Sequence, residues 1–344
     1  MRFILNLILL FFWLISGSIF AKEFVVDIYN KINPIAGNTI FGYNQNPKKP
    51  KIVEVNSDGK IIWEYKIPKH LFKTKKRNVW DVKVLDNLNI LFSLRNSGIY
   101  EINRQGEIIW QHLDKEASHD VDRLDNGNTI YARTWVEKGE DLVVEVDQYG
   151  QKVWSYDGVS HFDQYPFSDI DLGGWVHANS VERLSNGNTL VSLRNFQMVV
   201  ELDKQGKIVW KQLFDCERAY DKWDIDHSGS PAGCMPHGPE IDHEQNTLII
   251  ALRMGEKRSD EPDNVYFIDR TTGQVVREWS GEKSRRIRDI DLLSYGNLLI
   301  QDNNKLIELN SDNEIVWQLR ASKLKWDERS KSKSLYKANR ITPR

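Results

Sequence analysis

The chain has 344 residues, 40% of them hydrophobic, which is long enough to bury a sizeable core in one closed β domain or in two smaller units. Its 47 basic and 49 acidic residues give a formal net charge of −2, which excludes any argument from overall charge for a nucleic-acid partner. Twelve Trp, twelve Tyr and thirteen Phe favour a strand-rich fold, because aromatic side chains suit a half-buried pleated surface.

The N-terminus predicts export to the periplasm or another extracytoplasmic compartment. One Arg precedes an apolar run from Phe3 to Phe20, and Ala21 follows, which is typical of a secretory signal peptide cleaved after Ala21. The same run is just long enough to span a bilayer, so an N-terminal membrane anchor is the alternative. We expect residues 1–21 to be the signal peptide or the anchor.

Six copies of one unit follow, each an alternating strand, a turn rich in Asp, Asn and Gly, and a second strand carrying Trp. The copies are KIVEVNSDGKIIWEY (51–65), IYEINRQGEIIWQH (99–112), VVEVDQYGQKVWSY (143–156), VVELDKQGKIVWKQ (199–212), VYFIDRTTGQVVREW (265–279) and LIELNSDNEIVWQL (306–319). A second hairpin, such as RLSNGNTLVSL (183–193), precedes each copy. Four antiparallel strands repeated six times predict an all-β, six-bladed β-propeller spanning residues 22–344 as a single domain.

The two ends of the repeat array indicate a closed ring and not an open solenoid, whose ends would need polar caps. In the C-terminal tail, Lys337-Ala338-Asn339 mirrors His177-Ala178-Asn179. We expect this tail to supply the innermost strand of the first blade; the alternative is a disordered basic tail. Each repeat Trp is expected to pack between neighbouring blades, with its N–H on a backbone carbonyl.

Aligned on their turns, the repeats place polar residues at one rim of the central channel. The residues at the heads of successive inner strands are Trp80, His119, Asn179, His237 and Arg288. His177 lies two residues before Asn179 on the same rim. If Asn186-Gly187 forms a two-residue type I′ turn, Asn179 faces Arg194 across the hairpin.

Three His, an Asn and an Arg without a matching carboxylate favour binding of an anionic, oxygen-rich group. A three-His zinc site is a rival interpretation, but a nearby Arg disfavours it because two cationic centres repel. The sequence contains no Gly-rich phosphate cradle, nucleophile elbow or Cys-pair zinc motif, so we expect no metal and no cofactor.

The only two cysteines are Cys216 and Cys234, which bracket the segment before His237. In an oxidising compartment such a pair predicts a disulfide; two buried free thiols are the alternative.

Several of these segments resemble the arylsulfotransferase family, the bacterial arylsulfate sulfotransferases that do not use 3′-phosphoadenylylsulfate. They are HDVDRLDNGNTIYA, WVHANSVERLSNGNTLVSLRN, PHGPEIDHEQNTLIIALR and YKANRITPR. The resemblance covers nearly the whole chain after the N-terminal segment. It implies a periplasmic six-bladed propeller that moves a sulfuryl group from an aryl sulfate to a phenol through a sulfo-histidine intermediate.

The resemblance also implies roles for individual residues. His237 would be the nucleophile, and Arg253, which ends the third segment, would bind substrate. His119, His177, Asn179 and Arg194 would hold the sulfuryl oxygens, and Cys216–Cys234 would match the disulfide that precedes the family's nucleophile. Well-studied members begin with a separate β-sandwich domain that this chain has no room for, so the resemblance implies no oligomeric state.

Two other functions fit the same repeats. One is a non-catalytic propeller that binds an anionic ligand or a protein partner. The other is a quinoprotein-like scaffold, suggested by the tryptophan-docking pattern at Asp269–Trp279. Six repeats instead of eight and the lack of vicinal cysteines count against the quinone cofactor.

Overall fold

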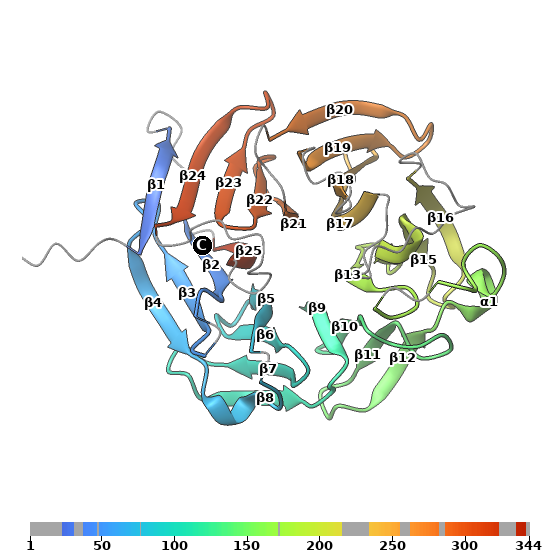
Figure 1. Cartoon of the computed structure of the whole chain (residues 1–344), viewed down its shortest axis with the longest axis horizontal. Helices are drawn as coiled ribbons and strands as arrows, with labels where there is room; N and C mark the ends of the chain where they lie inside the picture. The colour runs from blue at the N-terminus through green and yellow to red at the C-terminus, as the bar shows by residue number, and fades with distance from the viewer. Residues whose placement is uncertain are drawn as a thin grey trace, which may run out of the picture.

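The computed structural model describes residues 23–30, 37–46, 48–75, 77–170, 173–214, 234–254, 262–281, 286–322 and 335–341. Within them the strands form six antiparallel sheets around a central axis, which confirms the predicted six-bladed propeller (Figure 1). The predicted signal peptide or anchor at residues 1–21 lies outside the described residues. None of the described helices has the length and apolar character needed to cross a membrane.

Each sheet is one blade, and its strands follow one another from the axis outward. Blade 1 has β25 (Leu335–Ile341), β2 (Asn38–Tyr43), β3 (Lys51–Val55) and β4 (Ile61–Lys66); blade 2 has β5 (Val79–Val84), β6 (Ile90–Leu94), β7 (Gly98–Ile102) and β8 (Ile108–His112). Blade 3 has β9 (Ala117–Arg123), β10 (Thr129–Arg133), β11 (Val143–Val146) and β12 (Lys152–Tyr156); blade 4 has β13 (Ala178–Arg183), β14 (Thr189–Leu193), β15 (Met198–Leu202) and β16 (Ile208–Leu213). Blade 5 has β17 (Cys234–Asp242), β18 (Thr247–Met254), β19 (Asn264–Asp269) and β20 (Val275–Ser280); blade 6 has β21 (Ile287–Leu292), β22 (Leu298–Asp302), β23 (Lys305–Leu309), β24 (Ile315–Ala321) and β1 (Phe24–Tyr29). The described helices are the 3-10 turns η1 (Lys69–Leu71) and η2 (Arg194–Phe196) and the short α1 (Val159–Phe162).

Both ends of the chain close the ring. The C-terminal strand β25 pairs with β2, with Ala338 opposite Phe41, and so becomes the innermost strand of blade 1 as predicted. The N-terminal strand β1 pairs with β24, with Phe24 opposite Ala321, which gives blade 6 a fifth strand that the repeats did not predict. Figure 1 shows the blue N-terminal and red C-terminal strands interleaved at this one place in the ring.

A tryptophan on the outermost repeat strand fastens one blade to the next. In five blades its indole N–H donates to a backbone carbonyl in a turn of the following blade, at 2.9 to 3.1 Å. The donor–acceptor pairs are Trp63–Arg104, Trp110–Gln148, Trp154–Lys204, Trp210–Arg270 and Trp317–Ser57. The predicted role of the repeat tryptophans is therefore confirmed for these five. Trp279 is buried in blade 5, and no such bond joins it to another described residue.

An arginine of the following blade completes each of these five joints. Its guanidinium carbon lies 4.6 to 5.5 Å from the centroid of the tryptophan ring, and it pairs with a glutamate on the third strand of the tryptophan's own blade. The triads are Trp63–Arg104–Glu54, Trp110–Arg123–Glu101, Trp154–Arg183–Glu145, Trp210–Arg270–Glu201 and Trp317–Arg340–Glu308. Each stacked, partly desolvated cation thus has a carboxylate partner.

The hairpin from β13 to β14 uses a three-residue loop, so the predicted two-residue type I′ turn is wrong. The amide of Gly187 donates to the carbonyl of Leu184, and the amide of Leu184 donates to the carbonyl of Asn188, both at 2.8 Å. Gly187 has a left-handed φ of 85°, whereas Asn186 is not among the residues with positive φ that a type I′ turn requires. The strand register therefore shifts by one residue from the predicted one.

A buried ion-pair cluster connects the C-terminal strand to blades 3 and 6. Lys337 of β25 is 3% exposed, and its Nζ lies 2.9 Å from Asp120 of blade 3 and 3.2 Å from Asp289 of blade 6. Burial opposes the positive charge, but Asp120, Asp289 and Asp81 outweigh it and raise the pKa of Lys337 well above its usual value. The ion pairs therefore help to seal the ring.

We expect Lys337→Met to lower the free energy of unfolding by about 3–5 kcal/mol, because it leaves the buried Asp120 and Asp289 carboxylates without their direct ion-pair partner. Chemical denaturation of the full chain measures this. The matched control is Lys115→Met, whose side chain is 83% exposed and which should change stability by no more than about 0.5 kcal/mol. Equal stability of the two variants would contradict a sealing role for Lys337.

Candidate active site

The inner strands interrupt their regular pairing at the same end of the channel. Register shifts occur near Trp80, at His119 and Asp120, at Asn179, after His237, at Arg288 and at Lys337. Such bulges turn side chains out of the regular alternation, and they are common at functional sites. Five of the interruptions lie at or next to the residues that the alignment of the repeats placed at one rim of the channel, and the sixth is in β25.

The ring is continuous from blade to blade. Arg288 of blade 6 lies over the ring of Tyr336 in blade 1, with its guanidinium carbon 5.1 Å from the centroid. Tyr336 meets Trp80 of blade 2 edge to face at 4.7 Å, and Trp80 stacks on His119 of blade 3 at 4.2 Å, between ring centroids. His119 in turn lies 5.3 Å from the ring of His177 before blade 4.

Blade 5 joins the ring through backbone contacts. The side-chain amide of Asn179 in blade 4 donates to the carbonyl of Pro236, one residue before His237, at 3.0 Å. On the other side, Gly238 packs against blade 6 so closely that a Cβ would lie 2.7 Å from the amide nitrogen of Ile290. Gly238 also has a φ of 53°, so both the space and the conformation require glycine. The position of His237 is therefore fixed from both neighbouring blades.

Arg194 contacts His177 and not Asn179, which corrects the predicted pairing. The shifted register, together with the bulge at Asn179, carries Arg194 one position further along the rim. Its Nη1 donates to Nε2 of His177 at 2.8 Å. The Nδ1–H of His177 donates to the carbonyl of Gly173 at 3.0 Å, so both ring nitrogens are engaged. His177 is therefore held as a neutral imidazole whose Nε2 lone pair accepts the hydrogen bond from Arg194.

His237 has one anchored nitrogen and one available nitrogen. Its Nδ1 lies 3.0 Å from the carbonyl of Met235, an acceptor, so Nδ1 carries the proton. Nε2 then has the lone pair, and no other described residue forms a hydrogen bond with it. The side chain is only 4% exposed. This is the tautomer that an imidazole nucleophile needs.

His119 has the same tautomer for a different reason. Two hydroxyls lie within hydrogen-bond distance of its Nδ1, that of Ser118 at 2.7 Å and that of Thr134 at 3.0 Å. The hydroxyl of Thr134 donates its proton to the carbonyl of Ala178 at 2.8 Å, so toward Nδ1 it can only accept, and the hydroxyl of Ser118 can accept from Nδ1 as well. Nδ1 therefore carries the proton and Nε2 the lone pair. The backbone of His119 is left-handed, with a φ of 45°, which is typical of strained positions at functional sites.

The electrostatics of the site keep the three histidines neutral. Burial lowers the pKa of His119, His177 and His237 well below the ordinary value, and the neighbouring cations lower it further. Among the charges acting on His237, Arg253 of β18 is the largest, followed by Arg194 and Arg288. Burial and then Arg253 also lower the pKa of Arg194 to about 9. A site with this excess of buried positive charge favours an anion.

A metal is not indicated by the arrangement of ligands. Within the part of the chain that the structure describes, no three His, Cys, Asp or Glu side chains are grouped as metal ligands.

Cys234 is fully buried at the start of β17. Cys216 lies outside the described residues, so its predicted disulfide with Cys234 stays a prediction.

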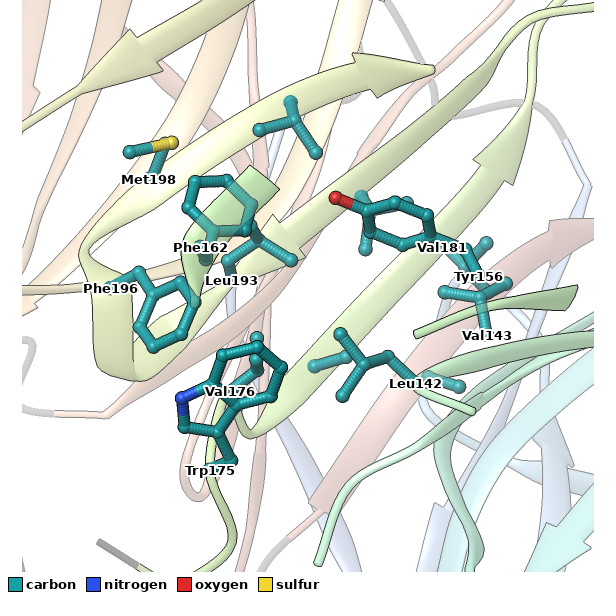
Figure 2. Close-up of a cluster of buried hydrophobic side chains, with 14 of the residues drawn as sticks. Leu142, Val143, Tyr156, Phe162, Trp175, Val176, Val181, Leu193, Phe196 and Met198 are labelled. Carbon is teal, nitrogen blue, oxygen red and sulfur yellow. The ribbon is translucent and has the colours of Figure 1, made fainter. Parts of the chain in front are cut away.

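Aromatic packing holds the segment that leads to His177 (Figure 2). Phe162 of α1 and Trp175 each contact Phe196, with ring centroids 5.2 and 5.4 Å apart. The surrounding cluster takes its side chains from both blade 3 and blade 4. It fixes the backbone beside Gly173, whose carbonyl orients His177.

Three residues of the site were missed from the sequence. Tyr336 joins the ring beside the bulge at Lys337 and contacts Trp80 edge to face. Trp135 contacts both His119 and His177, with ring centroids 5.3 and 6.0 Å apart. Arg95 was missed although Ser-Leu-Arg-Asn occurs at residues 93–96 and again at 192–195, where it includes Arg194.

These features define a class of protein: a six-bladed propeller with a desolvated histidine–arginine site at one end of its channel. The model of the arylsulfotransferase (ASST) family matches residues 28–212, more than half of the chain, and the chain belongs to this family. His237 and Arg253 lie beyond the matched residues. No curated protein matches the sequence.

Solved structures show the same fold at low identity. A protein of unknown function from Bacteroides caccae is 16% identical, with a TM-score of 0.58 over 88% of this chain and 98% of its own. A streptogramin B lyase is 14% identical, with a TM-score of 0.51 over 88% of each chain. A catalytically inactive virginiamycin B lyase from Staphylococcus aureus with quinupristin is 16% identical, with a TM-score of 0.51 over 88% of this chain and 90% of its own. At these identities the likeness concerns the fold alone.

We expect the three site histidines to stay neutral at about pH 5.5, about one unit below the ordinary pKa of about 6.5. Because their folded pKa values are lowered, they contribute stability above about pH 6.5 that is lost as the pH falls below it. Imidazole ¹⁵N NMR of the folded protein checks this, with the urea-unfolded chain as reference. An imidazolium signal from any of the three in the folded protein at about pH 5.5 would contradict the neutral assignment.

Proposed function

We propose that this protein is an arylsulfate sulfotransferase that works through a sulfated His237. Family membership supports sulfotransferase activity in general. The observation that carries the finer proposal is the state of His237, with Nδ1–H held by the Met235 carbonyl and Nε2 without a described partner. Three arginines act on this histidine, and they would stabilise the negative charge of a sulfuryl group.

In the first half-reaction, Nε2 of His237 attacks the sulfur of an aryl sulfate. The N–S bond forms as the S–O bond to the aryl group breaks, and the phenolate leaves with that electron pair. The ring of His237 becomes cationic, and the carbonyl of Met235 stabilises it through the Nδ1–H hydrogen bond. Arg194, Arg253 and the ring of donors around them would hold the sulfuryl oxygens.

In the second half-reaction, an acceptor phenol takes the place of the departed phenolate. Nε2 of His119 has a free lone pair in the neutral tautomer, so it can accept the phenolic proton as the phenol oxygen attacks sulfur. The S–N bond breaks and its electron pair returns to His237. The proton on His119 then passes to the next leaving phenolate or to solvent, which restores the starting state.

His177 and Asn179 are better suited to positioning than to proton transfer. The lone pair of His177 accepts from Arg194, so this histidine fixes the direction of the guanidinium. Asn179 holds the backbone one residue before the nucleophile. Both therefore support the geometry in which His237 meets the sulfur atom.

We expect His237→Ala to lower transfer from 4-nitrophenyl sulfate to phenol by at least about 1,000-fold, because the covalent route is lost. Release of 4-nitrophenolate measures the rate. Intact-protein mass spectrometry of the wild type with donor alone should show a gain of one SO3 group, mapped to His237.

The matched control is His243→Ala, because His243 is exposed in the turn after β17 and should retain full activity. Transfer that survives in His237→Ala would overturn the proposed nucleophile. Binding of aryl sulfate by the wild type without transfer to any of several phenols would instead assign a non-catalytic anion-binding propeller.

We also propose that the protein is exported and that Cys216 pairs with Cys234. Neither cysteine should react with a thiol reagent in the native or unfolded protein until a reductant is added. N-terminal sequencing of the protein from the extracytoplasmic fraction should begin at Lys22 if the segment is cleaved. Recovery of the protein only in the cytoplasm, with two reactive thiols, would contradict both proposals.

A further inference from the structure

Arg95 repeats the position of Arg194 two blades earlier in the ring. Both arginines directly follow the second strand of a blade, after Leu94 of β6 and Leu193 of β14. The backbone amide of Arg95 donates to the carbonyl of Asn78, at the head of β5, at 3.0 Å. Arg95 is therefore brought to the same rim as the histidines, on the side of blades 2 and 3.

Two indole rings flank the side chain of Arg95. Its guanidinium carbon lies 5.4 Å from the centroid of Trp80 and 5.0 Å from that of Trp135. The two indoles lie 5.7 Å apart at an interplanar angle of 61°. The Nε atom of Arg95 lies 3.3 Å from the side-chain oxygen of Asn96, which uses one of its five donors. Burial lowers the pKa of Arg95, as expected for a desolvated cation.

The other arginines of the propeller that stack on a repeat tryptophan have an acidic partner. The five joint arginines that stack on a repeat tryptophan are each paired with a glutamate. Arg95 stacks on two tryptophans, and no carboxylate among the described residues forms an ion pair with it. A half-buried guanidinium whose terminal N–H groups form no hydrogen bond with another described residue is suited to binding an anionic group of a ligand. Its planar arrangement of N–H donors matches the two oxygens of a carboxylate.

The flanking indoles also link Arg95 to the reacting centre. Trp80 stacks on His119 at 4.2 Å, and Trp135 meets His177 edge to face at 6.0 Å, between ring centroids. Arg95 is thus one aromatic side chain away from the groups proposed to act on the sulfuryl transfer. A ligand whose aryl ring lies along these indoles would present its phenol oxygen to the histidines and an anionic substituent to Arg95.

We propose that Arg95 binds an anionic substituent, a carboxylate, on the phenolic substrate, so that this sulfotransferase acts on acidic phenols and their sulfate esters. The proposal rests on the proposed function for the identity of the reaction, but the binding of the carboxylate is independent of turnover. Arg95 is then a specificity-determining residue, and the transfer chemistry takes place at His237.

The test compares two acceptors that differ in one group, 3-(4-hydroxyphenyl)propionate and its uncharged amide, with 4-nitrophenyl sulfate as donor. The wild type should prefer the acid over the amide by about 10- to 100-fold in kcat/KM, the size of a charge-assisted hydrogen-bond pair. In Arg95→Met this ratio should fall to near one, and Arg95→Lys should retain part of it. Arg277→Met is the matched control, because Arg277 also stacks on a ring, that of Phe267, and should keep the wild-type ratio.

A wild-type ratio near one, or an unchanged ratio in Arg95→Met, would overturn the proposal. If neither acceptor is sulfated, the proposed function fails, and calorimetric binding of the same two phenols then decides on Arg95 separately. The acid should bind the wild type at least about tenfold more tightly than the amide, and Arg95→Met should lose this difference. Equal binding of acid and amide to the wild type would overturn the carboxylate site as well.

Discussion

The tryptophan joint between blades is the interaction on which the rest of the propeller depends. It acts at the outer strands, far from the axis, where a small rotation between two blades would cause a large displacement. One indole N–H, one stacked arginine and one glutamate fix that rotation in five places. Because the angles between blades are fixed at the outside, six inner strands can hold side chains within van der Waals contact at the centre.

Apart from Arg95, which lies between two indoles, the site is divided into an aromatic half and a cationic half. Blades 1 to 3 contribute Tyr336, Trp80 and Trp135, which form a continuous set of ring contacts with His119. Blades 4 to 6 contribute the arginines at positions 194, 253 and 288 that act on His237. The same register shift in each inner strand therefore presents aromatic side chains on one side of the channel and arginines on the other. An amphipathic ligand, with an aryl body and an anionic ester, matches this division.

The blades and the ring of polar residues could be predicted because both follow from local repeats. The register of the site hairpin could not. Asn186-Gly187 is compatible with a type I′ turn and with a three-residue loop that needs positive φ only at Gly187, and the observed pairing of Arg194 with His177 depends on which one forms. The pairing of β1 with β24 joins residues almost 300 positions apart, and no local pattern encodes it. Arg95 lies in a repeated tetrapeptide, so its position was accessible, but its two indole neighbours come from different blades.

The interleaved closure makes the site the last part of the molecule to be completed. Tyr336 and Lys337 enter the ring only with β25, after all the strands that carry His119, His177 and His237. A chain that has folded blades 2 to 6 would hold His237, the proposed nucleophile, and its arginines but would lack one aromatic wall and the direct ion-pair partner of Asp120 and Asp289. Residues 335–341 are thus the last to be added to the ring, and a ring without them lacks the wall formed by Tyr336.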